Sequence, residues 1–205
     1  MRIMKLCAGL AAGAALFATA ACNKDQAGKD AATGGNAALA ESNPTASSDP
    51  VASAESAAPA AIAHDAAIAT IDATGAMKTI REGKNGWTCM ADSPATPGPD
   101  PMCMDTNAAK WAAAWIGKKT PPAGTVGVMY MLEGGTDASN TDPYATKPTA
   151  DNDWVKTGPH IMVVGSKEIL AGHPSGAKPD TAVPYVMWAG TPYAHLMVPV
   201  AAVPQ

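Results

Sequence analysis

Two short segments of the chain combine side chains that bind soft metal ions. His160-Ile161-Met162 and His195-Leu196-Met197 share the pattern His-x-Met, and both fall in segments whose composition predicts β-strands. Side chains two residues apart on a strand point to the same face of the sheet. Each segment therefore presents an imidazole together with a thioether, and all four side chains converge if the two strands are neighbours. This ligand set suits copper, above all Cu(I).

The same residues also have a purely structural interpretation. The chain holds 11 methionines and one phenylalanine, so methionine can fill core positions that aromatic residues occupy elsewhere. A histidine on a strand commonly hydrogen-bonds to the backbone or to a carboxylate. Further methionines near the cysteines can add to a metal site or to the core: Met90, Met102 and Met104. We keep copper binding as the alternative function of the four residues, and core packing as their default role.

Cys89 and Cys103 are predicted to form a disulfide, because the N-terminal segment described below predicts export to an oxidising compartment. In the loop-entropy model such a bridge stabilises the fold by about 3 kcal/mol. A zinc site is the weaker interpretation, since 13 residues separate the two cysteines and no histidine is nearby. Redox catalysis is weaker again, because active dithiols are usually much closer in sequence.

No sequence motif of a catalytic site is present: the G-x-S-x-G, H-E-x-x-H, P-loop and G-x-G-x-x-G patterns are all missing. A Ser/His/Asp set can be drawn from Ser139, His160 or His195, and Asp137 or Asp142, but nothing in the spacing favours it. We therefore predict no catalytic residues.

Two other polar or aromatic groups have both a binding and a structural interpretation. The turn-rich segment 134–143 offers side-chain oxygens for calcium but lacks the D-x-D-x-D-G pattern, so Asx and ST turns explain it better. Near the C-terminus, Tyr185, Trp188 and Tyr193 either line a ligand groove or belong to the core.

A β-sheet has to position these residues. Strands are expected at 66–72, 77–81, 125–132, 159–164, 184–188 and 193–200, the first two forming a hairpin about Thr74-Gly75. The clear helix spans 106–118, with Asp105 or Thr106 as its cap and Trp111 and Trp115 on one face. One helical turn is expected at 167–171.

Long loops are expected between these elements. The loop at 83–105 carries Pro94, Pro97, Pro99 and Pro101, and a polar loop ends at Asp153. The predicted class is α+β: a mainly antiparallel sheet with one main helix and long Pro/Gly-rich loops.

The N-terminal segment has the layout of a bacterial lipoprotein signal. Arg2 and Lys5 precede an uncharged apolar stretch at 6–21, and Thr19-Ala20-Ala21-Cys22 resembles a lipobox, in which the cysteine is acylated. Several acyl chains, palmitate among them, anchor a protein stably. Asn23 replaces the aspartate that favours inner-membrane retention, so the resemblance implies the outer membrane, facing the periplasm. The alternative is an ordinary signal peptide with a chance cysteine.

The composition changes after Cys22. Residues 22–63 include 14 alanines and no aromatic residue, which predicts a disordered Ala/Ser-rich tether with a reach of roughly 35 Å. A partly helical spacer is the alternative, because alanine favours helices. All five tryptophans and all four tyrosines follow, so residues 64–205 are predicted to form one domain after the signal peptide (1–21) and the tether.

Overall composition excludes several classes of protein. The net charge of −4 argues against nucleic acid as a partner, because such binders carry a basic surface. The chain has no second long apolar run, which excludes a multi-span membrane protein. The expected contact with the membrane is the N-terminal lipid alone.

Six segments of the predicted domain resemble known sequences: NGWTCM (85–90), DPMC (100–103), SNTDP (139–143), TGPHIM (157–162), PYVMW (184–188) and TPYAHLMVPV (191–200). Together they resemble a family of uncharacterised bacterial exported proteins or lipoproteins, over roughly residues 75–200. The resemblance implies one intact domain and brings no activity, substrate or cofactor. The sequence thus favours an envelope lipoprotein with a non-catalytic domain that binds a ligand or a partner, and a periplasmic copper-binding protein is the alternative.

Overall fold

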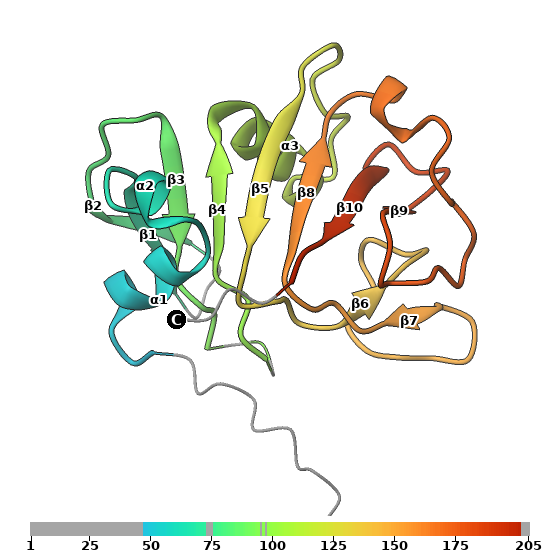
Figure 1. Ribbon diagram of the computed structural model, residues 1–205, viewed down its shortest axis with the longest axis horizontal. Coiled ribbons are helices and arrows are strands. Elements are labelled where there is room, and N and C mark those ends of the chain that lie inside the picture. The colour runs from blue at the N-terminus through green and yellow to red at the C-terminus, as the bar shows by residue number, and fades with distance from the viewer. Residues whose placement is uncertain (1–46, 73–75, 95, 97, 202–205) are drawn as a thin grey trace, which may run out of the picture. The chain divides into compact units, whose positions relative to one another are not determined.

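An eight-stranded sheet organises the part of the chain that the computed structural model describes, residues 47–72, 76–94, 96 and 98–201 (Figure 1). The strand order is β2-β1-β3-β4-β5-β8-β10-β9. Their bounds are β1 (Ala67–Ile71), β2 (Met77–Arg81), β3 (Trp87–Met90), β4 (Met102–Asp105), β5 (Gly127–Met131), β8 (His160–Val164), β9 (Tyr185–Met187) and β10 (His195–Pro199). β1 and β3 pair in parallel and the other neighbours pair antiparallel, which confirms the predicted α+β class.

Helices cover both faces of this sheet. In Figure 1, α1 (Pro50–Ser56) and α2 (Ala60–Ala63) lie in front of its β1–β4 end, and α3 (Thr106–Ile116) lies behind β4 and β5. Because neighbouring residues of a strand point to opposite faces, Cys103 and Met104 enter different cores. Cys103 packs with the alanines of α1 and α2, and Met104 packs with Trp111 of α3.

The start of α3 is fixed by a single carboxylate. Asp105 Oδ1 accepts hydrogen bonds from the backbone N–H groups of Asn107 (3.0 Å) and Ala108 (2.8 Å), as a helix N-cap does. Its Oδ2 accepts a third bond from Val128 N in β5. Asp105 therefore both begins the helix and ties it to the strand beneath, which confirms one of the two predicted caps.

The predicted strands are present with small shifts of their ends. β1 and β2 form the expected antiparallel hairpin, whose Thr74-Gly75 turn lies outside the described residues. The expected helical turn is the 3₁₀ helix η1 (Glu168–Leu170). The polar loop after β5 contains a small extra sheet of β6 (Ala138–Ser139) and β7 (Trp154–Val155), which the sequence analysis did not expect.

The expectation of one continuous loop at 83–105 is wrong. β3 and β4 lie within it and pair antiparallel, with Cys89 directly opposite Cys103. Pro94, Pro99 and Pro101 lie between the two strands, where they interrupt no sheet hydrogen bonds, and Pro97 lies outside the described residues. The disulfide between Cys89 and Cys103 is present, and both cysteines are fully buried.

The expectation that the tether continues to residue 63 is also wrong. Asp49 caps α1 by accepting a hydrogen bond from Val51 N, and Pro50 occupies the first turn. Ala54 and Ala57 have no exposed surface, because small side chains let the helix lie close to the disulfide. The Arg81 guanidinium then donates to Glu55 Oε1 (2.6 Å) and to the Ala63 carbonyl oxygen. The folded domain thus begins before residue 50 rather than at residue 64.

The predicted signal peptide (1–21), the lipidated Cys22 and the tether residues up to 46 lie outside the described residues. Within the part of the chain that is described, no helix has both the length and the apolar composition that crossing a membrane requires.

Candidate functional site

A row of four methionines crosses the centre of the sheet on the face that α3 covers. Met104 of β4 is the cross-strand partner of Met129 of β5, which in turn pairs with Met162 of β8. Met162 pairs directly with Met197 of β10. Paired residues on adjacent strands present their side chains on the same face, so the four thioethers form one continuous row.

The two predicted histidines flank this row in opposite directions. His160 lies two residues before Met162 and opposite Pro199, whereas His195 lies two residues before Met197 at the other end of the strand pair. All four predicted metal ligands therefore share one face, as expected. The backbone positions of the two histidines are offset by four residues, or about 13 Å along the strands. The register thus places the two histidines on opposite sides of the Met162–Met197 pair rather than side by side.

Each imidazole is anchored through the same nitrogen. His160 Nδ1 lies 2.6 Å from the Gly158 carbonyl oxygen, and His195 Nδ1 lies 3.0 Å from that of Tyr193. In both cases the acceptor is two residues earlier in the chain. Nδ1 must carry the proton in order to donate, so the neutral ring has its lone pair at Nε2. This tautomer leaves Nε2 available to a ligand.

Burial keeps both rings neutral. His160 and His195 are buried, and burial lowers the pKa of His160 below its ordinary value. Burial also lowers the pKa of His195 to about 4, and the charge of a protonated His160 acts in the same direction. Nε2 of His195 is completely buried and has no hydrogen-bond partner among the described residues. An unpaired buried nitrogen of this kind is costly and calls for an explanation.

The surroundings of His195 are aromatic. Its ring meets Trp111 edge to face at 5.4 Å and Trp188 at 4.9 Å between centroids. Trp188 has a φ of 56°, a left-handed backbone that a bulky residue rarely adopts. Two bonds to the β6 segment hold it there: its Nε1 donates to the Ser139 carbonyl (2.9 Å) and its N–H to that of Asn140 (2.8 Å).

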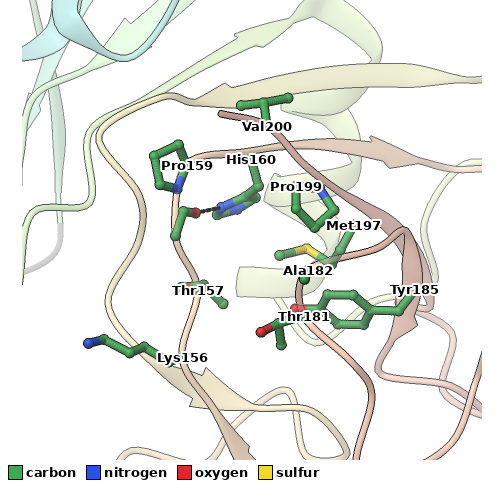
Figure 2. Close-up of a pocket in the computed structure, with 11 residues that line it drawn as sticks. Lys156, Thr157, Pro159, His160, Thr181, Ala182, Tyr185, Met197, Pro199 and Val200 are labelled. Atoms are coloured by element: carbon green, nitrogen blue, oxygen red, sulfur yellow. Dashed lines mark hydrogen bonds between the residues drawn. The ribbon is translucent and has the colours of Figure 1, made fainter. Parts of the chain in front are cut away.

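A cavity of about 370 Å³ opens beside His160 (Figure 2). Its walls come from the segment before β8, the loop before β9 and the end of β10: Lys156, Thr157, Gly158, Pro159, His160, Thr181, Ala182, Tyr185, Met197, Pro199 and Val200. Figure 2 shows the His160 ring held by its bond to Gly158, with Met197 and Tyr185 extending toward the same space.

The cavity offers few polar groups on mainly apolar walls. Burial raises the pKa of Tyr185 to about 12, so its hydroxyl stays protonated and can donate. The neutral His160 ring can accept at Nε2, and Lys156 is among the lining residues. Gly135 packs closely against two residues of the cavity lining. A Cβ at this position would lie 3.4 Å from His160 Cε1 and 3.1 Å from Thr157 Oγ1. A pocket of this size and character fits a small organic ligand.

The other predicted groups have structural roles. Tyr185, Trp188 and Tyr193 all belong to the buried core, and Tyr185 also lines the cavity. In the segment 134–143, Ser139 Oγ accepts from the N–H groups of Thr141 and Asp142, and Asp142 Oδ1 accepts from Tyr144 N. These are the ST and Asx turns that the sequence pattern predicted in preference to calcium binding.

Of the cavity residues, only His160, Tyr185 and Met197 were predicted from the sequence, and the lining residues of two loops were missed: Lys156, Thr157, Gly158 and Pro159 before β8, and Thr181 and Ala182 before β9. Pro199 and Val200, at the end of β10, were also missed. No sequence pattern links the loop residues, because the two loops meet only in the folded chain. Among the described residues, no group of three or more histidine, cysteine and carboxylate side chains is placed to hold a metal ion. Methionine thioethers are a separate class of ligand.

Comparisons of the chain with protein-family models, with curated proteins and with solved structures each found no match. The resemblance to uncharacterised exported proteins therefore stays a prediction.

Proposed function

We propose that this protein is a lipoprotein of a bacterial cell envelope whose folded domain binds a small organic molecule without chemically changing it. The observation that supports ligand binding is the cavity beside His160, with apolar walls and a few polar groups facing one space. The sequence of residues 2–23 supports the anchor. The ligand would reach the domain from the periplasm.

The cavity chemistry favours a ligand with an apolar body and at least one hydroxyl or amide group. Pro159, Ala182 and Pro199 offer apolar surface, while the Tyr185 hydroxyl can donate a hydrogen bond and His160 Nε2 can accept one.

The anchor is tested by metabolic labelling with palmitate. A Cys22→Ala variant should lose the label and leave the membrane fraction, since Cys22 is the proposed attachment site. Cys7→Ala is the matched control, because Cys7 lies inside the apolar stretch of the signal. A Cys22→Ala protein that is still labelled and still bound to membranes contradicts the anchor.

Ligand binding is tested by screening small molecules against the full-length protein in detergent, with thermal shift and native mass spectrometry as readouts. An Ala182→Trp variant should lose the hits, because the indole fills the cavity. Ala113→Trp is the control, since Ala113 is exposed on α3 and does not line the cavity. If Ala182→Trp binds every hit as well as the wild type does, the cavity is not the binding site.

A further inference from the structure

We propose that the domain also binds one Cu(I) ion on the α3 face of the sheet, with the thioethers of Met162 and Met197 and Nε2 of His195 as ligands. This site is separate in chemistry from the organic ligand of the cavity, although Met197 borders both. Copper is then a cargo or a sensed ion rather than a catalytic centre.

The strand register brings the two sulfur ligands together. Met162 and Met197 are direct cross-strand partners, and such pairs have Cβ atoms about 5 Å apart on one face. Flexible methionine side chains can bring two sulfur atoms to one ion from this spacing.

The histidines distinguish this methionine pair from the others in the row. Met104 and Met129 are also direct partners, but neither has a histidine two residues away on its strand. Met162 has His160 and Met197 has His195 at that spacing. Of the four methionines in the row, only these two have a histidine two residues away on the same strand.

His195 is the nitrogen ligand because its Nε2 needs a partner. The atom is buried without a hydrogen bond, while Nδ1 is committed to the Tyr193 carbonyl. A backbone carbonyl that fixes the far ring nitrogen is the usual support of a metal-bound histidine. Trp188, whose indole packs against this ring, has a left-handed backbone conformation. Backbone strain of this kind is often found at functional sites.

The ligand set selects a soft monovalent cation. Two thioethers and one imidazole carry no negative charge, so they suit Cu(I) and the similar ion Ag(I) better than Zn²⁺, Ca²⁺ or Mg²⁺. The indoles of Trp111 and Trp188 border His195 and favour a cation near their ring faces.

The cavity supplies a way in. His160 and Met197 both line it, so an ion in the cavity can contact the His160 imidazole and the Met197 side chain. His160 is thus a positioning residue for entry, and four residues of offset keep it out of the final ligand set.

The site is tested with the full chain carrying Cys7→Ala and Cys22→Ala, which removes both thiols outside the disulfide. Ag(I) is titrated by calorimetry, and Cu(I) is titrated under argon against a chromogenic Cu(I) chelator. We expect one ion per chain and a loss of affinity of roughly 100-fold or more in Met162→Leu, Met197→Leu and His195→Ala. Met129→Leu and His64→Ala, which keep the three ligands, should bind as the parent does.

A second measurement on the unmutated site guards against misfolded variants. With ¹³C-labelled methionine methyl groups, Ag(I) should shift the signals of Met162 and Met197 more than those of the other methionines. The proposal is overturned if the parent binds neither ion below micromolar concentrations. It is equally overturned if Met129→Leu weakens binding as much as Met162→Leu, or if the largest methyl shifts belong to other methionines.

Discussion

Met162 of β8 and Met197 of β10 are direct partners on adjacent antiparallel strands. Each has a histidine two residues earlier on its own strand. Because the strands are antiparallel, the two histidines lie on opposite sides of the methionine pair. The His160 imidazole lines the cavity, whereas the His195 imidazole is buried against two tryptophans. A repeated sequence pattern thus produces two different environments.

The packing of α1 predicts that the domain depends on residues before His64. Ala54→Glu should destabilise the fold strongly, by roughly 3 kcal/mol or more, because it buries a carboxylate against the disulfide. Ala52→Glu, on the exposed side of the same helix, should change the free energy of unfolding little. Urea unfolding of both variants checks this. Equal stabilities would mean that α1 does not pack on the sheet in solution.

Gly127 is predicted to be irreplaceable at the contact between α3 and β5. A Cβ there would lie 2.3 Å from Ala108 N, and backbone cannot give way as a side chain can. Gly127→Ala should therefore cost several kcal/mol, on the order of a severe core mutation. Gly176→Ala, where the added methyl meets nothing within 4 Å, is the control. Thermal unfolding followed by circular dichroism measures both, and equal melting temperatures would contradict the prediction.

The disulfide is predicted to stabilise the β3–β4 pair rather than to act in redox chemistry. Replacing both Cys89 and Cys103 by alanine should lower the free energy of unfolding by about 3 kcal/mol, through loss of the constraint on a short loop and of two buried sulfurs. Chemical denaturation gives the value, with Cys7→Ala as the control. A double variant as stable as the parent would show that strand pairing alone holds this loop.

The buried His195 predicts a loss of stability in mild acid. Its pKa is about 4 in the fold against 6.5 for the free side chain, so the unfolded chain binds the extra proton in this interval. This contribution is fully present above pH 6.5 and is lost as the pH falls toward 4, by roughly 3 kcal/mol in total. Burial of His160 acts in the same direction.

The protonation state can be observed directly in the metal-free protein by ¹⁵N correlation spectra of the imidazoles. At pH 5.5 the His195 ring should still show one protonated nitrogen, Nδ1, and one bare nitrogen, Nε2. Two protonated nitrogens at that pH would refute the assigned burial of this ring.

Local patterns allowed much of the sheet to be predicted. β8, β9 and β10 were recognisable because β-branched, aromatic and methionine residues follow one another between turn residues. The start of α3 was predictable from Asp105, because a carboxylate before an alanine-rich run is typical of a helix N-cap. β3 and β4 were missed because four-residue strands beside several prolines resemble a loop.

The same kind of signal was present at α1 and was outweighed by composition. Asp49-Pro50 is an N-cap followed by a proline in the first turn, a recognisable helix start. The segment nevertheless looked unable to fold, because it has few large apolar residues. Alanine can still be fully buried where a helix lies close to a sheet, as at Ala54 and Ala57.

For the candidate site, the sequence by itself determined which residue types stand two apart on each strand, and hence that each His-x-Met pair shares a face. Alternation along a strand is a local property of the backbone. Only the tertiary structure decided that β8 and β10 are neighbours, that Met162 faces Met197, and that the histidines lie at opposite ends. Register depends on contacts between segments far apart in the chain, together with the loops that close the cavity, and no local pattern carries that information.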